Sequence, residues 1–320
     1  MRLIHATLAL AALALAPLPV RAQLVQPEFL YKLSSMTGVL PMQGVKVVHD
    51  PFHHETLVVG EGRVRIFNAS GMEVFSFGED PAIGGVTSAA PLEDGDFLLL
   101  SFRQGRPAVL RANFRGELKS VIELKGIPGM APEDLGASVI GAAKDRIYLG
   151  SLGAMHVFVF DMQGNFVAHH DVGKMVGEMA GKDERAGPFR REDHGMRSMR
   201  VAPNGDVLFT VPTLFRAFVL SPDGSLEAFG MKGSAPGKFN VISSMDRDER
   251  GYYYVTDILK SAVMVYDSQF RFLKEFGYRG GRPGSLFSPV DVAAGGGKVF
   301  VSQYARKGVS VFAIKVGDAP

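Results

Sequence analysis

The sequence contains no cysteine and no tryptophan among its 320 residues. The absence of cysteine excludes disulfide bridges, thiolate metal sites, c-type haem attachment and a lipid anchor on a leader cysteine. Neither sign of charge is in large excess, since the formal net charge is only +2. This balance by itself indicates neither a nucleic acid nor a membrane as partner. With 46% hydrophobic residues, 38 glycines and 18 prolines, the composition is typical of a turn-rich globular chain that is stabilised by packing.

Long hydrophobic runs are missing except at the N-terminus. There, Arg2 precedes the apolar run LIHATLALAALALAPLPV, and small residues before Gln23 form the pattern of a cleavage site. Pro17 and Pro19 interrupt this run before it reaches the roughly 20 residues of a membrane-spanning helix. We therefore expect residues 1–22 to be a secretory signal peptide, with the protein exported to the periplasm or the medium and no membrane span.

A repeated pattern of short strands and turns runs through the rest of the chain. Its clearest marker is a β-branched or aromatic run that ends in a turn: IFNASG (66–71), LRANFRG (110–116), VFDMQG (159–164), VLSPDG (219–224), VYDSQF (265–270) and VFA (311–313). The marker recurs every 45 to 60 residues or so, and each of the first five units contains four apolar runs of strand length. Six four-stranded units predict an all-β, six-bladed β-propeller of antiparallel blades.

The last unit lacks its fourth strand. It contains SPVDVAA, KVFVSQ and VSVFAI, and a short tail follows. The segment 27–35, PEFLYKLSS, is similar to the fourth strands EVFSFG (73–78) and RFLKEFG (271–277) of other units. We expect it to pair with the last blade, because that pairing closes the ring and removes an exposed sheet edge. The prediction is a single domain over residues 23–317.

Two similar glycine-rich phrases, FGMKGSAPGKF (229–239) and FGYRGGRPGSLF (276–287), flank one unit. Between them lie DRDERG (246–251), YYYVTD (252–257) and SAVMVYD (261–267). This combination resembles an NHL repeat over roughly 229–315, although YVTD is also similar to the YWTD propellers. The phrases are predicted to connect the outer strand of one blade to the inner strand of the next, with glycines at positive φ. No helical pattern follows either phrase, so neither is predicted to bind phosphate as a P-loop does.

Metal-dependent enzymes resemble this fold and offer an alternative. Lyases of the peptide-amidating class hold zinc with histidines at the starts of inner strands, but here only His194 occupies such a position. The five equivalent positions carry Gly44, Val86, Ser138, Phe239 and Ser288. Catalytic zinc needs three protein ligands, so His194 remains a weak metal candidate.

The central channel is predicted to be lined by Lys46, Ser138, Ser243 and Asp291. Gluconolactonase-like and virginiamycin-lyase-like propellers are the other enzymes that the fold resembles, and the former bind a divalent cation through oxygen ligands. Asp291 is the only carboxylate in the predicted set, and a hard cation needs several oxygens. No serine-hydrolase or zinc-protease motif is present. We therefore expect no cofactor and no catalysis, with a zinc- or calcium-dependent lyase or lactonase in the channel as the alternative.

Charge is predicted to differ between the two faces of the disc. Basic residues are in excess on the face of the between-blade connectors and the second-to-third-strand loops, whereas acidic residues are in excess on the opposite face. A basic face attracts anionic partners. Some NHL domains use a comparable face for RNA, but the export signal disfavours nucleic acid. An acidic protein or a polysaccharide is the predicted partner of a monomeric, exported binding or scaffold module.

A long connector at residues 173–193, between blades three and four, belongs to this basic face. Long loops on a rigid scaffold often carry function. The residues predicted to contact the partner are basic or aromatic and come from this insertion and from neighbouring loops: Arg185, Phe189, Arg190, Arg191, Arg197, Arg103, Arg216 and Arg306.

Overall fold

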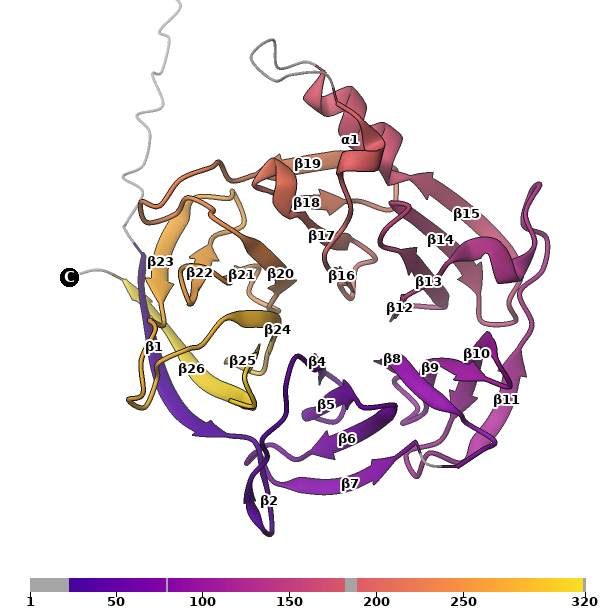
Figure 1. The fold of residues 1–320 in the computed structure, drawn as a ribbon, viewed down its shortest axis with the longest axis horizontal. Coiled ribbons are helices and arrows are strands. Elements are labelled where there is room, and N and C mark those ends of the chain that lie inside the picture. Colours follow the sequence, from indigo (N-terminus) through magenta and orange to yellow (C-terminus); the bar gives the residue numbers. More distant parts are fainter. Residues whose placement is uncertain (1–22, 79, 182–188, 319–320) are drawn as a thin grey trace, which may run out of the picture.

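The computed structural model describes residues 23–78, 80–181 and 189–318 and confirms the all-β, six-bladed propeller (Figure 1). Six four-stranded antiparallel sheets stand around a central channel, with β4, β8, β12, β16, β20 and β24 innermost. The predicted signal peptide and Arg185 lie outside the described residues. No helix in the described ranges is long and apolar enough to cross a membrane.

The first three blades follow one another along the chain. Blade one contains β4 (Lys46–Asp50), β5 (Glu55–Gly60), β6 (Arg63–Phe67) and β7 (Glu73–Phe77). Blade two contains β8 (Gly85–Pro91), β9 (Phe97–Arg103), β10 (Arg106–Ala112) and β11 (Leu118–Ile122). Blade three contains β12 (Val139–Ala143), β13 (Arg146–Ser151), β14 (His156–Asp161) and β15 (Phe166–Asp171).

The remaining blades continue this order. Blade four contains β16 (Met199–Val201), β17 (Val207–Val211), β18 (Arg216–Leu220) and β19 (Leu226–Phe229). Blade five contains β20 (Ile242–Arg247), β21 (Tyr253–Asp257), β22 (Ala262–Tyr266) and β23 (Phe272–Phe276). Blade six contains β24 (Pro289–Gly295), β25 (Lys298–Gln303), β26 (Val309–Asp318) and β1 (Gln23–Lys32). The short elements are β2 (Ser34–Ser35), β3 (Gly38–Val39) and the 3₁₀ turns η1 (Pro132–Leu135), η2 (Arg191–Asp193) and η3 (Pro212–Leu214).

The N-terminal strand closes the ring, as predicted. β1 pairs antiparallel with β26 in the sheet order β1-β26-β25-β24, and Phe29 stands opposite Phe312. The strand spans Gln23–Lys32 rather than 27–35, and Ser34 and Ser35 belong to a separate short hairpin. Because β1 pairs with β26, the edge of β26 is covered.

The glycine-rich phrases are connectors between blades. Gly230 has φ 93°, and a Cβ there would lie 2.0 Å from the Phe239 ring. Gly277 has φ 85°, and a Cβ there would lie 2.5 Å from Leu286 Cδ1. Phe239 and Leu286 are both fully buried, so the second phrase uses leucine where the first uses phenylalanine. Glycine is required at these positions by both backbone conformation and close approach.

The acidic residues of the NHL-like motif stabilise turns and connectors. Asp248 accepts hydrogen bonds from the backbone N–H groups of Arg250 and Tyr252 and from the Tyr254 hydroxyl. Asp257 accepts hydrogen bonds from the backbone N–H groups of Asn240 and Val241 in the connector. The resemblance therefore lies in residues that build the blade.

The insertion between blades three and four begins with a helix, which sequence analysis did not predict. α1 spans Val172–Ala180, and the Asp171 side chain caps it by accepting a hydrogen bond from the Lys174 N–H at 2.9 Å. Val172 and Val176, one helical turn apart, are buried against blades three and four. A cap and an apolar face suffice to fold this short segment as a helix on an existing surface. The interpretation of the whole insertion as a loop was wrong for this part.

Candidate functional site

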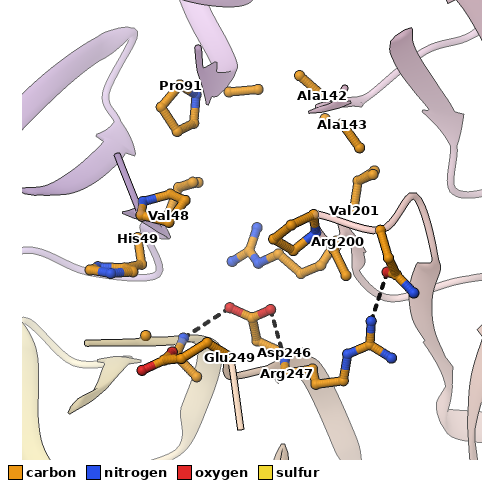
Figure 2. Close-up of a pocket in the computed structure, with 18 of the residues that line it drawn as sticks. Val48, His49, Pro91, Ala142, Ala143, Arg200, Val201, Asp246, Arg247 and Glu249 are labelled. Atoms are coloured by element: carbon orange, nitrogen blue, oxygen red, sulfur yellow. Dashed lines mark hydrogen bonds between the residues drawn. The ribbon is translucent and has the colours of Figure 1, made fainter. Parts of the chain in front are cut away.

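A cavity of about 810 Å³ lies at one end of the central channel (Figure 2). The ends of all six inner strands and the turns that follow them contribute to its lining. Small apolar side chains of β8 and β12, including Pro91, Ala142 and Ala143, stand along one side, and charged side chains of β16 and β20 stand along the other. A cavity of this size with few polar groups is the usual form of a small-molecule site.

Asp246 is the acidic group deep in this cavity. Its carboxylate accepts hydrogen bonds from the backbone N–H groups of Ala294 at 2.9 Å and Arg247 at 2.8 Å. Among the described residues no side chain donates a hydrogen bond to it. Burial raises the pKa of Asp246 to about 6, and the nearby Arg200 partly opposes this effect. The carboxylate can thus exchange a proton close to neutral pH, a property that is frequent in functional sites.

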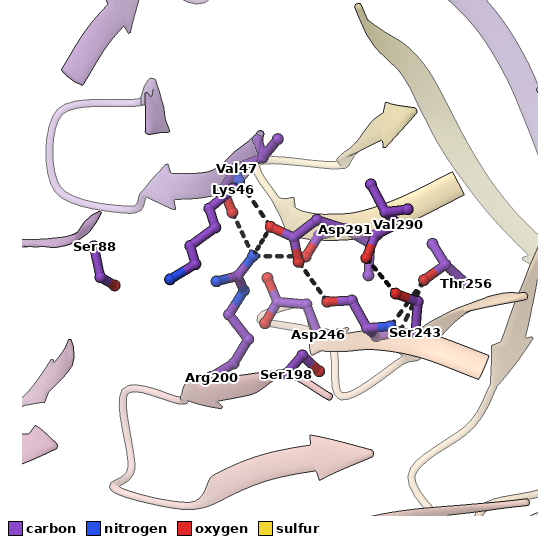
Figure 3. Close-up of polar contacts among 12 residues, drawn as sticks. Lys46, Val47, Ser88, Ser198, Arg200, Ser243, Asp246, Thr256, Val290 and Asp291 are labelled. Carbon is purple, nitrogen blue, oxygen red and sulfur yellow. Dashed lines mark hydrogen bonds and ion pairs between the residues drawn. The ribbon is translucent and has the colours of Figure 1, made fainter. Parts of the chain in front are cut away.

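Arg200 extends from β16 across the channel and joins three blades (Figure 3). Its Nη2 donates hydrogen bonds to the Val47 carbonyl at 2.6 Å and to Asp291 Oδ2 at 2.5 Å. Asp291 also accepts hydrogen bonds from Ser244 Oγ at 2.6 Å and the Val47 N–H at 2.8 Å. Asp291 therefore has its oxygens occupied by partners from blades one, four and five, and its role is to hold the ring together.

The other predicted channel residues also make contacts that connect the blades. Lys46 Nζ donates hydrogen bonds to the carbonyls of Thr87 at 3.0 Å and Ser138 at 2.9 Å, and burial lowers the pKa of this ammonium. Ser243 Oγ donates a hydrogen bond to the Val290 carbonyl at 2.6 Å. Ser138 thus contributes a backbone carbonyl to the channel contacts, and Lys46 links blades one, two and three.

These residues do not fit a divalent cation. Asp291 is already paired with Arg200, and Asp246 is a single carboxylate without a second carboxylate beside it within the described part of the chain, so the several oxygen ligands of a hard cation are not assembled. His194, the metal candidate, stacks on Phe189 with ring centroids 4.6 Å apart and bonds Thr213 through Nδ1 at 2.7 Å. In the ranges that the structure describes, no three histidine, cysteine, aspartate or glutamate residues are grouped as metal ligands.

His49 lies beside the cavity and is held by packing. Its ring stacks on Phe300 with centroids 5.8 Å apart, and a Cβ at Gly295 would lie 2.0 Å from His49 Cδ2. Its Nδ1 is buried without a hydrogen-bond partner. Burial lowers the pKa of His49, so the ring is neutral at pH 7. Only glycine at position 295 lets the imidazole fit here.

The predicted contact residues that the structure describes stand away from this cavity, on the loops and connectors of the other face of the disc. Arg190, Arg197 and Arg306 are exposed, whereas Arg103 and Arg216 are half-buried. Arg197 Nη2 donates a 3.4 Å hydrogen bond to the hydroxyl of Tyr304, two residues before Arg306, which brings loops of blades four and six together.

Arg191 is occupied within the fold. Its guanidinium pairs with Asp171 at 2.8 Å and donates hydrogen bonds to the Ala154 carbonyl and to His156. It fastens the insertion to blade three. Of the predicted contact residues, Arg191 therefore has a structural role, and Phe189 packs over the ring of His194.

A second, smaller hollow of about 250 Å³ lies between the last connector and blade six. Its charged lining residues are Lys32, Arg282 and Lys307, and none of its lining residues is acidic. Lys32 Nζ donates a 3.0 Å hydrogen bond to the Lys307 carbonyl, and burial together with Lys307 lowers the pKa of Lys32. We name these three cations and the Gly280–Ser285 loop the basic hollow.

Sequence analysis missed both Asp246 and Arg200. Asp246 appeared as the first residue of the NHL-like segment DRDERG and was not predicted to line the channel, although it belongs to β20, and Arg200 of β16 was not singled out. Strand alternation contained the signal for Asp246, because Ser244 faces the channel and residues two apart share a face. No comparable signal was available for Arg200, whose contacts are set by the opposite side of the ring.

The arrangement defines the chain as a six-bladed β-propeller, and comparisons with known proteins agree. No family model and no curated protein matches it. A protein of unknown function from Bacteroides thetaiotaomicron superposes with a TM-score of 0.59 at 14% identity, over 92% of this chain and 76% of that one.

Two propellers of known kind are also similar in structure. Virginiamycin B lyase from Staphylococcus aureus has a TM-score of 0.53 at 10% identity, over 93% of this chain and 89% of that one. Hydrazine synthase from Kuenenia stuttgartiensis has the same TM-score and identity, over 88% of this chain and 96% of that one. Identities this low show a shared fold and carry no activity across.

Proposed function

We propose that this protein is an exported propeller of the NHL type that acts as a monomeric binding module for an anionic partner, an acidic protein or a polysaccharide. The observation that carries the proposal is the basic hollow, in which three cations and no carboxylate line one depression. Uncompensated cations in a concave site concentrate the field that attracts anions. The exposed Arg197 and Arg306 extend basic character over the same end of the channel.

The basic hollow suits a carboxylate or sulfate group more than a metal-bound substrate. Arg282 and Lys307 are exposed and free to reorient, while Lys32 is half-buried and held by its bond to Lys307. An anionic group that enters would offset the burial and the repulsion by Lys307 that lower the pKa of Lys32. The alternative, a metal-dependent lyase or lactonase in the channel, loses support because Arg200 is the ion-pair partner of Asp291 and the described residues hold no group of three possible metal ligands.

The test uses the mature chain, residues 23–320, with poly-L-glutamate and polygalacturonate as anionic probes and neutral dextran as reference. We expect both anions to bind, more weakly at higher salt, and the double variant Arg282→Ser/Lys307→Ser to bind about tenfold more weakly. The matched control is Arg115→Ser, which removes an exposed cation from a third-to-fourth-strand turn. If the control and the double variant lost affinity equally, the loss would reflect the overall charge of the protein rather than the basic hollow, and this would contradict the proposal.

A further inference from the structure

The cavity at the other end of the channel contains more charged groups than its internal ion pairs account for. Three lining charges are paired: Arg200 with Asp291, Arg247 with Asp206 at 2.8 Å, and Asp248 with Arg250 at 2.7 Å. Arg247 is further held by Asn204 and the Tyr253 hydroxyl. These groups are neutralised by partners within the protein, so they contribute little to binding a charged ligand.

The lining charges that remain are mostly acidic. Asp246 lies deep in the cavity, and Glu93 and Glu249 lie exposed at its rim, with Lys144 as the single remaining cation. No ion pair is recorded for any of these four in the part of the chain that the structure describes. The turns around the rim belong to the face for which sequence analysis predicts an excess of acidic residues. The field in the cavity therefore favours a cation.

From this geometry we propose that the cavity binds a small organic cation, with the ammonium group on Asp246 and the apolar body along the side formed by Pro91, Ala142 and Ala143. A volume of about 810 Å³ accommodates a drug-sized molecule. Charge-assisted hydrogen bonds to a half-buried carboxylate are among the strongest polar contacts that a site can offer. This site lies at the opposite end of the channel from the basic hollow and does not depend on the proposed partner.

The surroundings of Asp246 suit an ammonium better than a metal ion. Arg200 from β16 and Asp291 from β24 act on it together, and their own pairing makes their combined charge small. From β4, Lys46 is turned toward carbonyls of blades two and three, and His49 is neutral. One carboxylate with two backbone N–H donors leaves room for a single monovalent cation.

Calorimetric titration with three matched probes tests the proposal: 4-phenylbutylamine, the neutral 4-phenylbutan-1-ol and the anionic 4-phenylbutyrate. We expect the amine to bind with one site per chain and about tenfold or more tighter than the alcohol. Asp246→Asn should remove this preference, whereas Glu227→Gln, on the outer strand β19, should keep it. Ala142→Phe should weaken the amine and the alcohol alike, because it fills the cavity from its apolar side.

Several results would overturn the proposal. Equal binding of amine and alcohol, tighter binding of the butyrate, or a preference that survives Asp246→Asn each contradict it. If Asp246→Asn fails to fold, the pH dependence of the unaltered protein decides. The amine preference should disappear as the pH falls below about 6, the pKa of Asp246, with the fold intact by circular dichroism. A preference that persists at pH 5 contradicts the assignment to Asp246.

Discussion

The two ends of the channel are built from the same six blades but present opposite charge. At one end, connectors between blades carry the basic hollow of Lys32, Arg282 and Lys307. At the other, the inner strands end in a cavity whose unpaired charges are mostly acidic. Turns that join the first and second strands of a blade favour aspartate, as Asp248 shows by capping its own turn. The net charge of +2 gives no sign of this difference.

The largest expected effect comes from removing the Arg200 bridge between blades, which lies beside the cavity. Arg200→Ala leaves Asp291 buried without its ion-pair partner and disconnects blade four from blades one and six. We expect the free energy of unfolding to fall by about 3–5 kcal/mol, as for other buried pairs that lose one partner. Urea denaturation measures this. Arg146→Ala, at an exposed pair with Asp145, is the control and should change stability by less than about 1 kcal/mol.

The next largest effect is expected in the pH dependence of stability, to which Asp246 at the cavity end contributes. The pKa of Asp246 in the folded state, about 6, lies above its ordinary value of 3.8, so the folded protein holds this proton more tightly than the unfolded one. Its contribution to stability is therefore fully present below pH 4 and is lost as the pH rises from about 4 to 6, by up to about 3 kcal/mol. Comparing the unaltered protein with Asp246→Asn by thermal unfolding across this range isolates the effect. A difference that does not change with pH would contradict it.

The smallest expected effect comes from a glycine-to-alanine substitution made once at each end. Gly295→Ala places a Cβ 2.0 Å from the His49 ring at the cavity, whereas a Cβ at Gly281 in the basic hollow meets nothing within 4 Å. We expect Gly295→Ala to cost about 1–3 kcal/mol and to weaken ligand binding in the cavity. Gly281→Ala should be neutral within about 0.5 kcal/mol. Equal costs would mean that His49 can move aside freely.

Much of this contrast was accessible from the residues alone. The turn markers predicted six blades, and the missing outer strand predicted closure by the N-terminal segment, which β1 and β26 confirm. The acidic and basic faces remain a prediction, which rests on assigning each loop to one side of the disc. α1 was not predicted, because nine residues with one cap form a helix only when Val172 and Val176 have a surface to pack against.

The sequence by itself determined the local structure. It specifies strands whose side chains alternate between two faces, turns that need aspartate or glycine, and a repeated four-stranded unit that cannot bury its apolar surface alone. What only the tertiary structure decided is which side chains meet in the channel. Arg200, Asp246 and Asp291 come from three different blades, and Arg200 reaches Asp291 only when these blades are arranged around a common axis. Local patterns act between neighbours in the chain, whereas these contacts depend on how six blades are placed around one axis.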